Sequence, residues 1–296
     1  RNLEIHILPV LGAKQLQQLT PTMLNTLYAS LASERADRRG LSAKTISYIH
    51  TIVHKALADA VDADLVVRNV ADRAKPPRPN RRASAGIQSW DADELRAFLA
   101  HVEGSRLAAI WRLAAITGMR RGKVLGLRWQ DVDLDTGRLS VHQALVAVAY
   151  SIVLSTPKSH NARVIDLDAE TVAMLCAHRL RQAQERAEWG ADYRDGDLVV
   201  AKENGEPIHP HTFSQSFERI VERAGLRTIR LHDLRHTHAS LALKAGVPVK
   251  VVSERLGRES PAFTLKQYAH VLPGMQAEAA AQVAALVAQP TPKQAS

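Results

Sequence analysis

A short stretch of the sequence, RLHDLRHTHASLALKAG (230–246), concentrates cationic and imidazole side chains before an apolar, Ala-rich run. These side chains belong to Arg230, His232, Arg235, His236 and His238. Burying charged groups at this density is costly unless an anion or a metal ion compensates them. The stretch therefore raises the question of whether it holds a metal, a phosphate or only water.

Three kinds of site are compatible with this spacing. His232 and His236, four residues apart and near His238, could bind zinc, although the Glu of a His-Glu-x-x-His arrangement is missing and an arginine would stand beside the metal. HASLALKAGVPVKVVSERLG (238–257) has the pattern of a helix-turn-helix, which is also common among ordinary helix pairs. A phosphate site is the third, because His232 and Arg235 share one side of a helix start and a guanidinium fits two phosphate oxygens.

Groups of the same kind recur along the chain. TGMRRG places Arg120 in a Gly-flanked turn at a helix start, Lys158 falls in the turn of a predicted hairpin, and ERLGR places Arg258 just after a glycine. Tyr268 follows in TLKQYAH, ten residues beyond that arginine. These residues add to the case for a phosphate site.

In this order the residues resemble the catalytic set of the tyrosine recombinase family, and specifically of the phage integrases. The set comprises Arg120, Lys158, His232, Arg235, Arg258 and Tyr268. TGMRRGKVLGLRWQDVDL resembles the family's first box, and RLHDLRHTHASLAL, VVSERLG and TLKQYAHVLPGM resemble its second. The helical part with LTPTMLNTLYASL resembles the core-site-binding domain, so the similarity covers nearly the whole chain.

The resemblance implies a mainly α fold with a small antiparallel β-sheet, in which an N-terminal helical DNA-binding domain precedes a mixed α/β catalytic domain. It also implies a site-specific recombinase that cuts and rejoins DNA through a 3′-phosphotyrosyl intermediate, without metal, ATP or cofactor. Tyr268 would attack the phosphorus, and Arg120 and Arg235 would bind the non-bridging oxygens. Lys158 would protonate the departing 5′ oxygen, and His232 would assist proton transfer at the tyrosine.

Two positions depart from the family's pattern. Lys123 stands where an acidic residue usually follows the first arginine by three positions, and a lysine there repels Arg120 instead of orienting it. Arg258 stands where phage integrases carry His or Trp. Both changes add positive charge, which either tightens DNA binding or reduces catalysis. We expect Lys123→Glu combined with Arg258→His to raise turnover.

Residues 1–73 are expected to form a helical domain that binds the core site. Thr20-Pro21 begins a helix over 20–35, and a second helix starts after Ser42 with a basic face opposite its apolar one. A basic, Pro-rich linker over 74–89 follows. The residues expected to contact DNA are Lys44, His50, Lys55, Arg78, Arg81 and Arg82.

Residues 90–296 are expected to form the catalytic domain. Asp91 and Glu94 form a capping box at its first helix, and the alternating, β-branched stretch before residue 169 predicts a short antiparallel sheet. Further helices are expected at 106–117, 120–128, 169–189, 211–224, 232–245, 248–256 and 261–270. An apolar C-terminal helix, 274–289, would dock on a neighbouring protomer.

Bulk composition limits the function classes. With 296 residues and 46% hydrophobic content the chain suits globular domains, and no apolar run reaches the roughly 20 residues of a membrane span. The net charge of +9 favours a polyanionic partner. Cys176, the sole cysteine, is expected to be a buried hydrophobe, and its lone presence suits a reducing cytoplasm. Because the first residue is Arg1, we expect a preceding segment, such as the arm-site-binding domain of related integrases.

The expected partners are double-stranded DNA attachment sites, a homotetramer on that DNA, and accessory bending or directionality factors, all in the bacterial cytoplasm at the nucleoid. The two domains would close around the duplex, and phosphate contacts would make binding sensitive to salt. Alternatives are a catalytically impaired DNA-binding protein on the same fold, type IB topoisomerase-like strand relaxation and, more distantly, a metal-dependent hydrolase.

Overall fold

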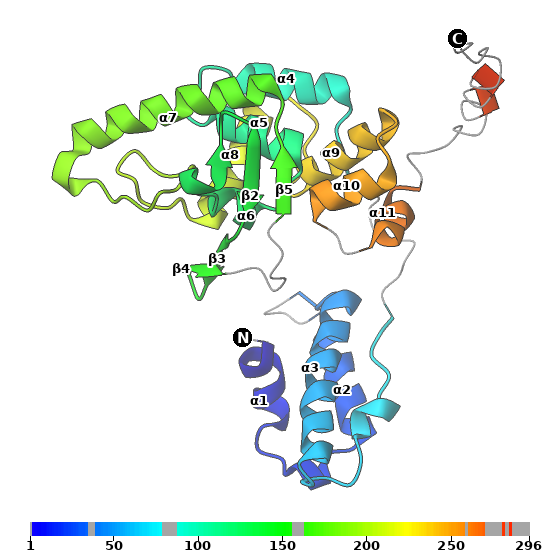
Figure 1. Ribbon diagram of the computed structural model, residues 1–296. Coiled ribbons are helices and arrows are strands. Elements are labelled where there is room, and N and C mark those ends of the chain that lie inside the picture. The colour runs from blue at the N-terminus through cyan, green and yellow to red at the C-terminus, as the bar shows by residue number, and fades with distance from the viewer. Residues whose placement is uncertain are drawn as a thin grey trace, which may run out of the picture. The chain divides into compact units, whose positions relative to one another are not determined.

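The computed structural model describes residues 2–34, 39–78, 88–155, 163–257, 260–269, 280–281 and 284–285. The chain divides into two compact units, Arg1–Gly86 and Ile87–Ser296. Both consist mainly of helices, and the strands of the described residues belong to the second unit (Figure 1). The predicted fold class, mainly α with small antiparallel sheets, is confirmed. No helix among the described residues is both long and apolar enough to cross a bilayer.

The N-terminal unit is a small helical domain built on two capped helices. Its α-helices are α1 (Leu8–Leu11), α2 (Pro21–Ala32) and α3 (Ala43–Asp62). The side chain of Thr20 accepts a hydrogen bond from the amide of Met23, and Ser42 accepts one from Thr45, so both helices begin where the sequence predicts. Leucine and isoleucine side chains of α2 and α3 form the core of this unit.

The second unit, which we call the catalytic unit after the role expected from the sequence, contains eight α-helices within the described residues. They are α4 (Ala92–Val102), α5 (Ala108–Thr117), α6 (Arg121–Leu125), α7 (Ala169–Trp189), α8 (Pro210–Arg223), α9 (Asp233–Lys244), α10 (Val249–Leu256) and α11 (Pro261–Tyr268). Asp91 and Glu94 form the predicted capping box at the start of α4. Figure 1 shows α9, α10 and α11 gathered at one end of this unit, with α7 running across the other. The C-terminal helix predicted at 274–289 lies almost entirely outside the described residues.

The strands form two sheets instead of the single sheet that was expected. β2 (Arg138–Val141) pairs with both β1 (Val132–Asp133) and β5 (Arg163–Asp166), while β3 (Ala144–Val148) pairs with β4 (Ser151–Ser155). β4 and β5, which precede and follow Lys158, therefore belong to different sheets. The prediction that they form one hairpin was wrong, because alternation of side chains identifies a strand but not its partner.

The core of the catalytic unit centres on aromatic side chains from four segments. The ring of Trp111 in α5 stacks on Phe213 in α8 with centroids 4.4 Å apart, and Phe98 in α4 packs against both Trp90 and Phe217. The amide of Trp90 donates to Thr237 Oγ1 in α9 at 3.0 Å. The core thus supports α9, the helix that carries the imidazole-rich stretch.

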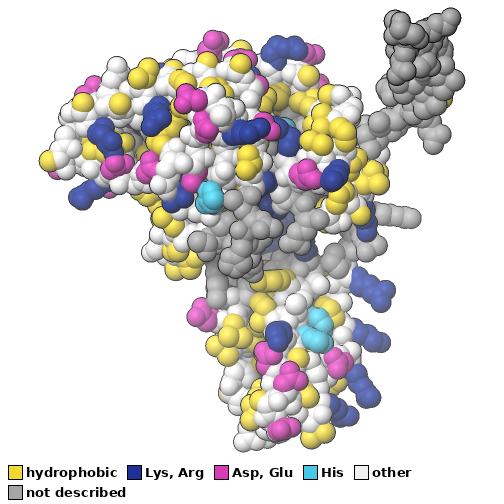
Figure 2. All heavy atoms as spheres, viewed as in Figure 1, with side chains coloured by type: hydrophobic (Ala, Val, Ile, Leu, Met, Phe, Trp, Pro, Cys, Tyr) yellow, Lys and Arg dark blue, Asp and Glu magenta, His cyan; other side chains and the backbone are white. Residues whose placement is uncertain are grey.

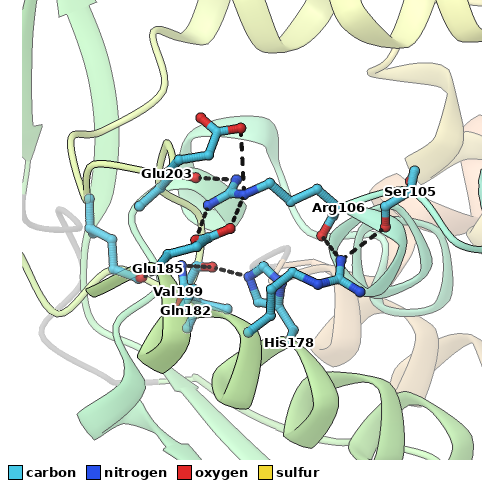
Figure 3. Close-up of polar contacts among 10 residues, drawn as sticks. Ser105, Arg106, His178, Gln182, Glu185, Val199 and Glu203 are labelled. Carbon is cyan, nitrogen blue, oxygen red and sulfur yellow. Dashed lines mark hydrogen bonds and ion pairs between the residues drawn. The ribbon is translucent and has the colours of Figure 1, made fainter. Parts of the chain in front are cut away.

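A second, polar anchor fixes α7 to the loop before α8 (Figure 3). The guanidinium of Arg106 donates two hydrogen bonds of 2.6 Å to the carboxylate of Glu185, and a third to the carbonyl of Ala201 at 2.8 Å. His178 contacts the carbonyl of Val199 through Nε2 at 2.8 Å (Figure 3). The two charged side chains are only 20% and 12% exposed, so removing one would leave the other charge poorly solvated.

Gly118 makes the turn between α5 and α6. Its φ of +60° is the left-handed conformation that glycine tolerates best. A Cβ at this position would lie 2.8 Å from Cδ2 of His238 and 2.9 Å from Cδ2 of Leu256. The turn therefore requires glycine for its backbone conformation and for its close packing against α9 and α10.

Cys176 is exposed, and the expectation that it is buried was wrong. The buried face of α7 comprises Thr171, Leu175, His178, Gln182 and Glu185. Cys176 follows Leu175 by one residue, which places it about 100° further around the helix, away from that face.

We predict that Glu185→Gln lowers the free energy of unfolding of the catalytic unit by about 3 kcal/mol, because Arg106 keeps its charge in a poorly hydrated place. All four tryptophans lie in residues 87–296, so urea unfolding followed by tryptophan fluorescence reports on this unit alone. The control is Arg138→Gln, which breaks an exposed ion pair with Asp166 and should change stability by less than about 1 kcal/mol. Equal effects of the two substitutions would contradict the prediction.

We also predict that Gly118→Ala destabilises the catalytic unit more than Gly246→Ala does. Gly246 has a φ of +78° with no atom within 4 Å of an added Cβ, so its alanine variant reports the backbone strain alone, about 1 kcal/mol. At Gly118 the collision with His238 and Leu256 adds to that strain, and a loss at least twice as large is expected in the same urea experiment. Equal losses of stability in the two variants would show that His238 and Leu256 move aside without cost, and would contradict the prediction.

Candidate functional site: a cationic hollow beside a buried tyrosine

The imidazole-rich stretch forms the start of α9, and an acidic residue fixes its geometry. Asp233 is 1% exposed and accepts hydrogen bonds from the backbone amide and the guanidinium of Arg230 at 2.9 to 3.0 Å. This pairing lowers the pKa of Asp233 although burial opposes the shift. Asp233 is thus an ionised side chain in the first turn of α9, where the helix dipole favours negative charge, and it fixes Arg230 beside the segment that carries His232 and Arg235.

Arg235 connects this helix start to the Gly118 turn. Its Nη1 donates a hydrogen bond of 2.7 Å to the carbonyl oxygen of Gly118. Arg120, two residues after that glycine, is the residue that precedes α6, and it is exposed. Arg120 and Arg235, the two arginines predicted to bind the phosphate, are therefore close in space although they are far apart in the sequence.

A hollow of about 550 Å³ opens between these elements. The residues that line it are Arg120, His232, Arg235, His236, Gly257, Ser260, Phe263 and Gln267. Three of the six predicted catalytic residues are among them. Two others, Lys158 and Arg258, lie outside the described residues.

Tyr268, the last predicted catalytic residue, lies at the end of α11 and is 0% exposed. Its hydroxyl is 2.7 Å from Nδ1 of His236, and the two ring centroids are 5.8 Å apart. The ring of His232 meets that of His236 edge to face, with centroids 5.4 Å apart. The tyrosine hydroxyl is thereby linked to the hollow through His236.

Positive charge accumulates on one side of this site. Burial lowers the pKa of Lys123, in α6, to about 8. The positive charges of Arg163, Arg120 and Arg235 add to this shift, because each disfavours a further cation nearby. The repulsion expected between Lys123 and Arg120 is confirmed, and it extends to two more arginines.

Arg163 and His238 belong to the same cluster. Burial, with the charges of Arg120 and Arg255, lowers the pKa of Arg163 to about 10. Burial, with neighbouring arginines, lowers the pKa of His238 to about 4, so this imidazole is neutral at physiological pH. Burial also lowers the pKa of His232, and Arg235 adds to that shift. The neutral forms of both histidines are therefore favoured.

The DNA-contacting residues expected in the N-terminal unit are placed as follows. Lys44, Lys55 and Arg78 are exposed, and Figure 2 shows Lys and Arg side chains along one edge of this unit. His50 is half-buried, with its Nδ1 2.9 Å from the hydroxyl of Tyr28, so it contributes to packing within the unit. Arg81 and Arg82 lie outside the described residues.

Two residues of the site were not identified from the sequence. His236 follows Arg235 directly, but its contact with Tyr268 spans 32 residues and leaves no pattern in the sequence. Arg163 lies in a strand of mixed character, VIDL after an arginine, where an exposed end would be the ordinary interpretation. The zinc hypothesis gains no support, since no group of three or more His, Cys, Asp or Glu residues in the described parts of the chain could hold a metal ion.

Comparison with known proteins agrees with this geometry. Residues 88–274 match the phage integrase family. The chain is 29% identical over 258 residues to the tyrosine recombinase XerC-like protein of Caldanaerobacter subterraneus subsp. tengcongensis, covering 82% of this chain and 66% of that protein. It is 28% identical over 246 residues to the ICEBs1 integrase of Bacillus subtilis, covering 81% and 65%. It thus spans slightly less than two thirds of either relative.

Solved structures show the same fold. The Tn1549 transposon integrase in complex with transposon right end DNA superposes with a TM-score of 0.72 at 17% identity, covering 94% of this chain and 89% of that one. A lambda integrase dimer bound to a COC′ core site gives a TM-score of 0.62 at 20% identity, covering 89% and 84%. The family match extends over more than half of the chain and includes every residue predicted to be catalytic. The chain therefore belongs to the phage integrase family of tyrosine recombinases.

Proposed function

We propose that this protein is a site-specific DNA recombinase that cuts and rejoins DNA through a 3′-phosphotyrosyl intermediate. The observation that supports it best is the contact between the Tyr268 hydroxyl and His236, beside a hollow lined by two arginines. A tyrosine becomes nucleophilic when a nearby group accepts its proton, and arginines stabilise the charge that builds on a phosphate under attack. Membership of the family supports the same assignment.

The reaction balances without any outside reactant. The Tyr268 oxygen forms a bond to phosphorus as the bond between phosphorus and the 5′ oxygen breaks, and the released oxygen takes up a proton, which we assign to Lys158. Arg120 and Arg235 bind the non-bridging oxygens. Because the phosphotyrosyl bond conserves the energy of the broken phosphodiester, a 5′ hydroxyl of the partner strand can reverse the step, and neither ATP nor a metal ion is required.

Two histidines share the proton chemistry at the tyrosine. His236 is the direct acceptor, since its Nδ1 is 2.7 Å from the Tyr268 hydroxyl. His232 lines the hollow and packs edge to face on His236, so it serves the phosphate side of the site. The lowered pKa of His232 favours the neutral ring, which is the form that can accept a proton.

The substrate is double-stranded DNA carrying an attachment site. In the N-terminal unit, Lys44, Lys55 and Arg78 present charge to the phosphate backbone. Recombination between two duplexes requires four active sites, so the working assembly is a homotetramer in which the helix at 274–289 docks on a neighbouring protomer. The bacterial cytoplasm, at the nucleoid, is the corresponding location.

A catalytically impaired DNA-binding protein is the second candidate. Two observations favour it: the Tyr268 side chain is fully buried, and Lys123 stands where the family carries an acid. Strand relaxation of the type IB topoisomerase kind would use the same chemistry without pairing two duplexes. Relaxation of supercoiled plasmid without joint molecules would identify that activity.

We predict a covalent protein–DNA adduct with a nicked half-site substrate taken from DNA flanking the gene. The reaction, run with a chelator and resolved on a denaturing gel, should give a slow-migrating band that Tyr268→Phe abolishes, because only the phenol oxygen can bond to phosphorus. Tyr150→Phe, at an 89% exposed tyrosine, is the matched control and should retain the band. Tight, salt-sensitive binding of the same DNA without any adduct would favour the impaired protein instead.

We further predict that His236→Asn slows adduct formation by about 100-fold or more while DNA binding is retained. Asparagine can accept a hydrogen bond from the tyrosine but cannot take its proton. His232→Asn is the comparison, measured in single-turnover cleavage of the same substrate. A larger loss in His232→Asn than in His236→Asn would overturn the assignment of His236 as the direct acceptor.

A further inference from the structure

The side chain of Arg163, a residue of intermediate exposure, ends in a shielded guanidinium without a hydrogen-bond partner among the described residues. Its Nε, Nη1 and Nη2 atoms are all shielded from solvent and all lack such a partner there. A guanidinium offers five N–H donors, and leaving a buried charge uncompensated is among the least favourable arrangements in a protein. A charge of this kind is retained where a ligand supplies the missing counter-charge.

The position of Arg163 points to the hollow as the place of that ligand. Its guanidinium lies against Gly257, whose φ is +62°, and a Cβ at residue 257 would collide with Nη1 of Arg163. Gly257 lines the hollow itself. Arg163 therefore lies next to the hollow, separated from it by Gly257. Because little water intervenes, its charge interacts strongly with an anion in the hollow.

Lys123 adds a fourth positive group around the same place. Its backbone amide donates to the carbonyl oxygen of Arg120 at 2.8 Å, so it lies one turn along the chain from a residue that lines the hollow. It faces the charges of Arg163 on β5, Arg120 before α6, and Arg235 on α9.

Three other elements pack on α6. β3 has no titratable residue, and the one charged residue of α5 is Arg112. α8, which includes Glu218 and Glu222, meets the segment through a hydrogen bond of 2.7 Å from Arg121 to the hydroxyl of Ser214. No ion pair in the described residues engages Lys123 or Arg163.

We propose that Arg163 and Lys123 make the hollow an anion site that is electrostatically destabilised while it is empty and is balanced when a DNA phosphate enters. They are positioning residues, because their charges set how strongly the site holds the anion without requiring contact with the reacting atoms. The identity of the anion rests on the function proposed above. On this proposal, the presence of Lys123 where the family usually has an acidic residue tightens phosphate binding.

Proton uptake follows from the same arrangement. In the empty site the pKa of Lys123 is about 8, below its ordinary value of 10.5. A bound anion offsets the repulsion from the three arginines and raises this pKa, although the effect of burial stays. Lys123 therefore gains a proton when the site fills at a pH just above 8. Anion affinity is therefore fully present below pH 8 and falls as the pH rises above it.

The experiment uses the full chain with sulfate as the probe and no DNA. Sulfate keeps its charge from pH 7 to pH 9.5, so any change in affinity belongs to the protein. Thermal unfolding followed by tryptophan fluorescence, which reports only on the catalytic unit, gives the stability with and without sulfate. Calorimetry at pH 8.5 in two buffers of different ionisation enthalpy gives the protons taken up.

For Arg163→Gln we expect two changes of opposite sign. The variant without sulfate melts at a higher temperature than the parent chain because a buried, uncompensated charge is gone, whereas its sulfate affinity falls by about tenfold. The control is Arg138→Gln on the neighbouring strand β2. The Arg138 side chain is 62% exposed, so this substitution should change neither the melting temperature nor the sulfate affinity. A lower melting temperature with unchanged sulfate affinity would show a purely structural arginine and would overturn the proposal.

For Lys123→Met we expect sulfate binding to persist more weakly and proton uptake at pH 8.5 to disappear. Uptake equal to that of the parent chain would remove Lys123 from the proposal. The result is independent of the recombinase assignment, because sulfate binding requires neither Tyr268 nor DNA. Sulfate binding as expected without any phosphotyrosyl adduct would therefore reject the proposed reaction and keep the anion site.

Discussion

The hydrogen bond from Arg235 to the carbonyl of Gly118 joins two segments that lie 117 residues apart in the sequence. It forms because Gly118 turns the chain in the left-handed conformation and so directs its carbonyl at α9. The same turn places Arg120 at the start of α6, on the hollow that Arg235 also lines. The remaining features of the site, from the two histidines to Gly257, are arranged around this junction.

That junction brings like charges together, which the rest of the unit must offset. The apolar and aromatic core that includes Trp90, Phe98 and Trp111 supplies the favourable free energy, and the buried pair of Arg106 and Glu185 holds the far side of the unit in place. At the hollow the ordinary rule of paired buried charges is broken, because Arg163 has no acidic partner among the described residues. Arrangements that lower stability in this way are expected mainly at functional sites.

The sequence predicted those elements that are specified by local interactions. The caps of α2, α3 and α4 are side chains within three residues of the amides they bind, so the patterns Thr-Pro, Ser-x-x-Thr and Asp-x-x-Glu were sufficient to locate them. The pairing of β5 with β2 was not predicted, since a strand pattern does not name its partner. The exposure of Cys176 depended on which face of α7 is buried, and an Ala-rich helix with scattered charges defines that face poorly.

The same distinction applies to the site. Arg120, His232, Arg235 and Tyr268 could be predicted as site residues because each stands in a motif with a known order. The contact of His236 with Tyr268 and the burial of Arg163 against Gly257 could not, because both arise from packing between distant segments. Spacing in the sequence indicates which residues lie on the same helix or strand. The protonation states of the site depend instead on which helices and strands pack against each other.

The burial of Tyr268 imposes a condition on any reaction at this site. The side chain packs in a small apolar cluster with Leu243, Val252 and Leu256, and it is not among the residues that line the hollow. Attack on a phosphate there requires α11 to shift relative to α10. One polar contact between these helices is the hydrogen bond of 2.8 Å from Ser253 to Thr264, and the other face of α11 exposes Phe263 and Leu265. A helix of eight residues packed on one face alone can move at modest free-energy cost, so the proposed reaction requires only a local movement to bring Tyr268 from His236 to the hollow.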